Sequence, residues 1–101
     1  MIELHLCGRV APGRRADLVE FLREAIPFYE SPGGIRVRLL WDIADPDRFV
    51  EVVEYADRET YDRDQARVTS DATMQDYLHR WRALLAEPPL VHSYDIDTPV
   101  A

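Results

Sequence analysis

The chain has 101 residues, 47% of them apolar and 31% charged, and its formal net charge at neutral pH is −7. This size and composition are typical of one soluble globular domain, which we expect to cover residues 1–97, with residues 98–101 as a tail. The acidic balance argues against binding to nucleic acid or to an anionic membrane surface, since both require a basic face. No apolar run approaches the roughly 20 residues that cross a bilayer. The single cysteine excludes an internal disulfide, so we expect a cytoplasmic protein.

Alternation and then helical spacing organise the first third of the chain. Residues 2–10 alternate between apolar and polar side chains and predict a strand. "APGR" turns the chain, and a helix is expected from Arg14 onward. Its apolar stripe consists of Leu18, Phe21, Leu22, Ala25, Ile26 and Tyr29. Pro27 falls inside this pattern and is expected to kink or end the helix.

A hairpin is predicted in the middle of the chain. The break "SPGG" at 31–34 precedes an alternating segment, 35–43, and the turn signature "ADPD" at 44–47 separates it from a third apolar segment, 48–55. Two strands joined by so short a turn pair in antiparallel fashion.

The third of these strands carries one carboxylate on each face. Side chains in a strand alternate, so Glu51 and Tyr55 share one face with Phe49 and Val53, and Glu54 lies on the other with Val50, Val52 and Ala56. Both faces are otherwise largely apolar, whereas a sheet with one wet face alternates cleanly. We therefore expect helices to cover one face and a second copy of the chain to cover the other, which predicts a homodimer.

The remainder of the chain predicts a helical region and a last strand. The first helical piece spans about 58–67 and is polar, and a second piece, capped by Ser70, has a strong apolar stripe that includes Met74 and Trp81. "EPP" at 87–89 ends the helix, and 90–96 form the last strand. The order β-α-β-β-α-β predicts an α+β, ferredoxin-like fold with a four-stranded antiparallel sheet.

Several of these segments resemble the antibiotic biosynthesis monooxygenase family of dimeric α+β barrels. They are "VAPGRRADLVEFLREAIP", "SPGGIRVRLLWD", "DPDRFVEVVEYADRETYD" and "LLAEPPLVHSYDI". The resemblance implies a homodimer with a pocket between sheet and helices in each protomer. Some members of this family oxidise phenols or quinols with dioxygen and no cofactor, and others degrade haem, so the resemblance implies one of these activities as an expectation. The haem-degrading members use an asparagine, a tryptophan and a histidine. This chain has no asparagine, and it has Tyr55 and Gln65 where that tryptophan and histidine would stand, so we expect no haem and no other cofactor.

Five residues are candidates for a site, each with a simpler structural explanation. His5 suits a proton acceptor, because imidazole titrates near neutrality, but it could equally be a hydrogen-bonded structural histidine. Tyr55 is a candidate because the resemblance to the family implies that an aromatic residue at this position lines the pocket. We therefore predict His5 and Tyr55 as catalytic residues. Trp41, Arg38 and Glu51 are predicted to bind substrate, although Arg38 could instead pair with a glutamate across the sheet. The histidines and the one cysteine show no metal-ligand spacing, so no metal site is predicted.

These observations predict a cofactor-independent monooxygenase acting on a small aromatic, phenolic or quinol substrate. Two alternatives use the same pocket. One is a non-catalytic homodimer that binds a small apolar ligand or a partner protein. The other is a cyclase or isomerase that transfers a proton. The fold hosts all three, so the sequence does not choose among them.

Overall fold

The computed structural model describes residues 1–97, and the predicted tail, 98–101, lies outside them. Four strands form one antiparallel sheet in the order β2-β3-β1-β4. The strands are β1 (Ile2–Arg9), β2 (Ile35–Trp41), β3 (Arg48–Tyr55) and β4 (Leu90–Asp95). The helices are α1 (Arg15–Glu30), α2 (Arg58–Ser70) and α3 (Ala72–Arg82). The predicted ferredoxin-like α+β fold is confirmed, with the second helical region divided into two helices.

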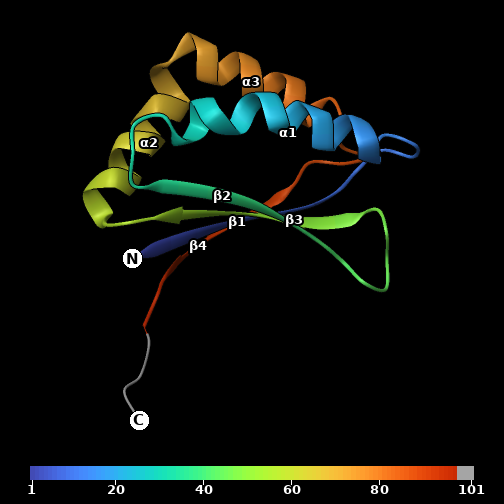
Figure 1. The fold of residues 1–101 in the computed structure, drawn as a ribbon, viewed down its shortest axis with the longest axis horizontal. Helices are drawn as coiled ribbons and strands as arrows, with labels where there is room; N and C mark the ends of the chain where they lie inside the picture. Colours follow the sequence, from blue (N-terminus) through green and yellow to red (C-terminus); the bar gives the residue numbers. More distant parts are fainter. Residues whose placement is uncertain (98–101) are drawn as a thin grey trace.

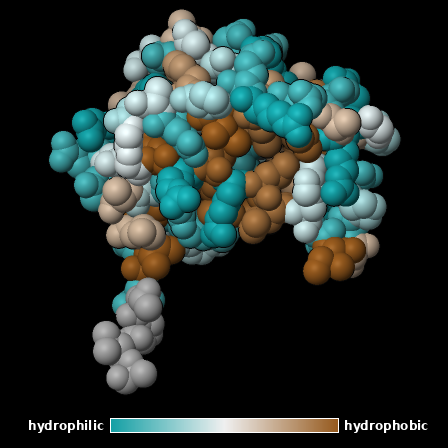
Figure 2. All heavy atoms as spheres, viewed as in Figure 1, coloured by the Kyte–Doolittle hydropathy of each residue, from teal (hydrophilic) through white to brown (hydrophobic). Residues whose placement is uncertain are grey.

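All three helices pack on one side of the sheet, and no helix of the described chain covers the other side (Figure 1). The main core lies between these layers and joins residues of β3 and the helices, among them Leu18, Phe21, Phe49 and Trp81. Figure 2 shows apolar side chains in the centre of the same view, between the polar surfaces of the two layers. We call the covered side of the sheet its inner face and the other side its outer face.

The hairpin forms where the sequence predicts it, with Trp41 opposite Phe49 and Ile35 opposite Tyr55. The turn is held by the Asp42 carboxylate, which accepts from the backbone N–H groups of Ala44 and Asp45. Three glycines adopt positive φ angles; Gly33 and Gly34 do so consecutively, at 85° and 74°, in the break before β2. Few other residues adopt two such angles in succession, which explains the glycine pair at this position.

Helix α1 includes Pro27 and ends three residues later, at Glu30, so Pro27 lies in its last turn. The prediction that Ser70 caps α3 is wrong. The cap of α3 is Asp71, whose carboxylate accepts from the backbone N–H of Met74, and Ser70 instead donates to the carbonyl oxygen of Ala66. An aspartate serves at this position as well as a serine, and its charge also favours the helix N-terminus.

No helix among residues 1–97 combines the length and the apolar character needed to cross a bilayer.

Candidate functional site

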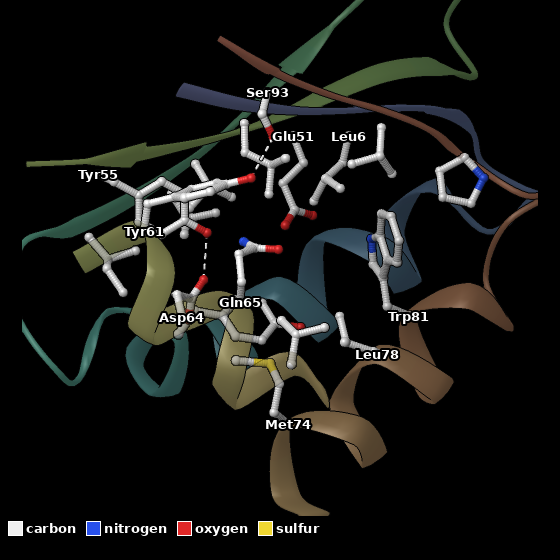
Figure 3. Close-up of a pocket in the computed structure, with 18 of the residues that line it drawn as sticks. Leu6, Glu51, Tyr55, Tyr61, Asp64, Gln65, Met74, Leu78, Trp81 and Ser93 are labelled. Carbon is white, nitrogen blue, oxygen red and sulfur yellow. Dashed lines mark hydrogen bonds between the residues drawn. The ribbon is translucent and has the colours of Figure 1, made fainter. Parts of the chain in front are cut away.

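A cavity of about 410 Å³ lies between the inner face of the sheet and helices α2 and α3. Its sheet wall comes from all four strands, and its opposite wall comes mainly from α2 and α3 (Figure 3). Most of the lining is aliphatic or aromatic, including Leu4, Val53, Met74 and Leu78. A concave and largely apolar space with a few polar groups is the usual form of a small-molecule site.

The helices present one face each to this cavity. On α2 the residues at positions i, i+3, i+4 and i+7 line it, namely Tyr61, Asp64, Gln65 and Val68. On α3 the same spacing brings Met74, Leu78 and Trp81 to the cavity. The charged run "DRETYDRDQAR" at 57–67 is typical of a solvated helix face, but one side of α2 lines the cavity instead. Tyr61, within this charged run, and Val68, directly after it, are seven residues apart, and this helical spacing was the signal for the buried side.

Glu51 is the carboxylate of the cavity. It lies on the central strand β3, and its neighbours across the sheet are Leu6 and Leu39. Its side chain is only 3% exposed, and its Oε1 has no hydrogen-bond partner among the described residues. Burial raises the pKa of Glu51 to about 7, because removal from water penalises the charged form. Glu51 can therefore exchange a proton near neutral pH.

Tyr55 also lies on the cavity wall, but its hydroxyl has a partner in the protein. It donates to Asp64 Oδ2 at 2.5 Å, and the other carboxylate oxygen of Asp64 accepts from Arg67 at 2.9 Å. Burial raises the pKa of Tyr55, and the bond to Asp64 raises it further. Arg67 in turn donates to the carbonyl oxygens of Phe28 and Tyr29 at the end of α1. This network therefore joins β3, α1 and α2 at one end of the cavity.

Replacing Tyr55 with phenylalanine tests whether this hydroxyl is structural. The change removes one buried hydrogen bond and leaves Asp64 its bond to Arg67, so we expect a loss of about 1 kcal/mol in the free energy of unfolding. Urea denaturation of purified Tyr55→Phe measures it, with Tyr77→Phe on α3, a half-buried tyrosine outside the cavity lining, as the control. An unchanged stability together with weaker ligand binding would instead assign the hydroxyl to the ligand.

The structure separates the five predicted site residues. Glu51 and Tyr55 line the cavity. His5 and Arg38 point to the outer face, where both flank Val52 in the register and each approaches Glu3. His5 Nε2 lies 2.6 Å from Glu3 Oε1, and Arg38 Nη2 lies 4.0 Å from Glu3 Oε2. One face of a strand does not reach the other, so His5 and Tyr55 do not share a pocket.

Trp41 lies at the far end of β2 from the cavity. Its ring is 6.0 Å from that of Phe49, and the guanidinium of Arg15 stands 4.1 Å above its centre. These contacts close the core at the turn of the hairpin. The sequence analysis did not predict Asp64 and Gln65 as cavity residues. Trp81, which it placed in the apolar stripe of the second helix, belongs to the core and also lines the cavity.

The mouth of the cavity runs along β4. This strand pairs only with β1, and its six residues are all exposed. Pro89, Val91 and Ser93 nevertheless line the cavity, and Ser93 hydrogen-bonds to the hydroxyl of Tyr61 across it at 3.0 Å (Figure 3). Within residues 1–97, no group of three or more histidine, cysteine, aspartate or glutamate side chains is arranged to hold a metal ion.

Solved structures of other proteins share this architecture. One is a Bordetella bronchiseptica protein described as an antibiotic biosynthesis monooxygenase. It is 28% identical in sequence, the match covers 96% of this chain and 97% of that protein, and the TM-score is 0.79. A protein of the same description from Nitrosomonas europaea is 22% identical over 94% and 97%, with a TM-score of 0.74. A third structure is a point mutant of SnoaB, a cofactor-independent oxygenase from Streptomyces nogalater. It is 14% identical in sequence, the match covers 98% of this chain and 95% of SnoaB, and the TM-score is 0.79. At identities this low, the last two likenesses show the fold alone.

The family model gives the assignment. None of the curated protein sequences matches the chain. The model named antibiotic biosynthesis monooxygenase matches residues 1–84, which include every strand and helix described above except β4. The match therefore covers the central strand with Glu51 and both helices that line the cavity. The chain belongs to the antibiotic biosynthesis monooxygenase family.

Proposed function

We propose that the protein is a cofactor-independent monooxygenase that oxidises a small phenolic or quinol substrate in the cavity beside Glu51. The observation that supports this most directly is the position of that carboxyl group. It is buried at the centre of the sheet, where burial raises its pKa to about 7, and it faces an apolar space large enough for a small aromatic molecule. The shared family supports the type of reaction.

Glu51 is the proton acceptor of the proposed reaction. A general base works best when its pKa lies near the working pH, and burial brings Glu51 to this range. The substrate O–H bond breaks, its proton passes to the Glu51 carboxylate, and the electron pair stays on the substrate as a phenolate. A phenolate is a far better electron donor to dioxygen than the neutral phenol.

The overall reaction then balances without a further reductant. A phenol and one dioxygen give a quinone and one water. The ring carbon loses its hydrogen and gains one oxygen atom, and the second oxygen atom leaves as water. All four electrons that reduce dioxygen come from the substrate, and Glu51 returns its proton to the departing water.

The walls of the cavity support this chemistry by excluding water. Apolar residues from both layers surround Glu51, and the hydroxyl pair of Tyr61 and Ser93 spans the mouth. Exclusion of water strengthens electrostatic interactions inside a site and protects a reactive anion from protonation by solvent. We assign Tyr55 to the wall as a residue that positions α2 through Asp64.

A homodimer through the outer face is the second part of the proposal. That face has no helix over it in the described chain and carries partly exposed apolar side chains, including Leu40 at 44% and Tyr94 at 47%. It also carries Arg36 and Arg38 on an edge strand and Glu3 and Glu54 on the two central strands. Two copies related by a twofold axis can place the basic edge of one sheet against the acidic centre of the other. In this arrangement His5 and Arg38 belong to the interface.

Sedimentation velocity tests the dimer. We expect a dimer at micromolar concentration for the natural chain and a monomer for Leu40→Glu, because the new carboxylate would be buried in the interface. The control is Ile43→Glu, which changes a fully exposed residue in the β2–β3 turn and should leave the dimer intact. A natural chain that sediments as a monomer at every accessible concentration contradicts this assembly.

Oxygen consumption with a panel of phenols and quinols tests the activity. We expect uptake that depends on substrate and enzyme, and a loss of at least about a hundredfold in Glu51→Gln, the range for removal of a general base. Tight binding of an aromatic ligand without oxygen uptake would favour the non-catalytic binding protein. Proton exchange or rearrangement of the ligand without uptake would favour the cyclase or isomerase.

A further inference from the structure

Three buried polar atoms in the cavity have no hydrogen-bond partner among residues 1–97. They are Oε1 of Glu51, Nε2 of Gln65 and Nε1 of Trp81. They come from β3, α2 and α3 respectively, and all three residues line the same cavity. Figure 3 shows the three side chains pointing into the space between the sheet and the helices. The polar atoms left unpaired in the described chain thus converge from three elements on one space.

Such atoms are costly to the folded state. Each buried donor or acceptor without a partner costs about 1–3 kcal/mol, so native proteins keep few of them. Apolar side chains at these positions would remove the cost, since leucine could replace Gln65 with a similar volume and phenylalanine could replace Trp81 with an aromatic ring that carries no N–H. Their presence around a cavity beside a buried carboxylate indicates that a bound molecule supplies the missing partners.

The hydrogen-bonding character of the three atoms defines that partner. The Gln65 amide nitrogen and the Trp81 indole nitrogen are donors, and the ionised Glu51 oxygen is an acceptor. A hydroxyl group offers the complementary set, because it has one hydrogen to donate and two lone pairs that accept. One oxygen atom therefore has the hydrogen-bonding capacity to satisfy all three.

We propose that Glu51, Gln65 and Trp81 form a hydroxyl site, in which one hydroxyl group of the substrate donates to Glu51 and accepts from Gln65 and Trp81. Gln65 and Trp81 then determine the specificity of the proposed monooxygenase for a hydroxyl group. The inference rests on the proposed function, because the hydroxyl site positions the phenolic substrate of that reaction. When the O–H bond breaks and the proton moves to Glu51, the negative charge on the substrate oxygen stays between two N–H donors. Donors fixed in a dry site stabilise such an anion far better than they would in water.

Other functional groups fit the hydroxyl site poorly. A methyl ether or a carbonyl oxygen accepts hydrogen bonds but donates none, and it would leave Glu51 buried without a partner. An arylamine brings two hydrogens and a weakly accepting nitrogen, and it would leave Gln65 or Trp81 unpaired. A site built to bond a hydroxyl group discriminates strongly against analogues that lack one, because its own polar groups then lose their partners.

Two naphthalene probes test the hydroxyl site on the full chain. Isothermal titration calorimetry compares 2-naphthol, which has the hydroxyl, with 2-methoxynaphthalene, which has the same rings and an ether. We expect the natural protein to bind 2-naphthol at least about tenfold more tightly. The absorbance of bound 2-naphthol, followed against pH, should show ionisation at a lower pH than in free solution.

Variants that remove one N–H each separate this role from a merely structural one. Gln65→Met and Trp81→Phe should reduce the preference for 2-naphthol and return the ionisation of the bound ligand toward its value in water. Gln75→Met, at an exposed position on α3, and Trp41→Phe, away from the cavity, are the matched controls and should change neither property. Thermal melting verifies that each variant is folded, and Gln65→Met alone suffices if Trp81→Phe does not fold.

The outcomes distinguish the hydroxyl site from the proposed function. Equal binding of both probes, no binding of 2-naphthol up to its solubility, or a preference that survives in both variants would overturn the hydroxyl site. Oxygen uptake that persists under any of these results would leave the monooxygenase proposal in place. Selective binding of 2-naphthol that depends on Gln65 and Trp81, without oxygen uptake from any phenol, would support the hydroxyl site and overturn the monooxygenase.

Discussion

Replacing Glu51 with glutamine is expected to make the protein more stable at pH 8 and to flatten the dependence of its stability on pH. The native pKa of Glu51 is about 7, above its ordinary value of 4.5, so the folded state holds this proton more tightly than the unfolded state does. The stabilisation is therefore complete below pH 4.5 and is lost as the pH rises through 7. The shift corresponds to about 3 kcal/mol over this range.

Urea denaturation of the two proteins at pH 5 and at pH 8 measures this effect. Other groups titrate over the same range, but they are common to both proteins and cancel in the difference. We expect the stability of Glu51→Gln relative to the natural chain to increase by about 2 kcal/mol from pH 5 to pH 8. Glu59→Gln, at an exposed position on α2, is the control and should give a difference near zero. A pH-independent difference for Glu51→Gln would show that Glu51 is ionised at ordinary pH.

Arg67→Met is expected to destabilise the protein by about 3 kcal/mol or more, because it leaves the Asp64 carboxylate buried without its cation. Only 14% of the Arg67 side chain and 9% of the Asp64 side chain are exposed, so solvent screens this ion pair weakly. The change also removes the bonds to the carbonyl oxygens of Phe28 and Tyr29 and the packing of the guanidinium on the ring of Phe28. Helix α2 would lose its main polar attachment to α1.

Two further variants isolate the cause. Arg63→Met, an exposed position on the same helix, should cost no more than about 0.5 kcal/mol. Asp64→Asn combined with Arg67→Met should recover part of the loss, since it removes the unpaired charge. A cost for Arg67→Met as small as that of Arg63→Met would show that the network with Asp64 and Tyr55 contributes little to the fold.

The order of the elements was predictable because local pattern and tertiary structure agree along most of the chain. The alternation in β1 and β2, the apolar run of β3, the glycine pair before β2 and the prolines after α3 each indicate the element or break that the structure shows there. The parity of β3 also predicted that Glu51 and Tyr55 share a face, and the register confirms it. The same pattern could not say which face the helices cover, because both faces of β3 carry apolar side chains and one carboxylate.

The site was less predictable, because its residues depend on contacts between distant segments. His5 suited a proton acceptor by its chemistry. It lies away from the cavity because the helices cover the opposite face of the sheet, which the sequence pattern did not indicate. Asp64 and Gln65 lie within a charged run, where only their helical spacing from Tyr61 and Val68 distinguishes them from their solvated neighbours. The unpaired nitrogen of Trp81 appears only when α3 is placed over the sheet.

The measurement that tests the central claim most directly is the reaction of the purified protein with a phenol under ¹⁸O₂, analysed by mass spectrometry. If Glu51 initiates a monooxygenation in this cavity, the quinone should carry one ¹⁸O atom, the second should appear in water, and Glu51→Gln should form at least about a hundredfold less labelled product. A quinone without ¹⁸O, or labelled product formed equally well by Glu51→Gln, would contradict the account.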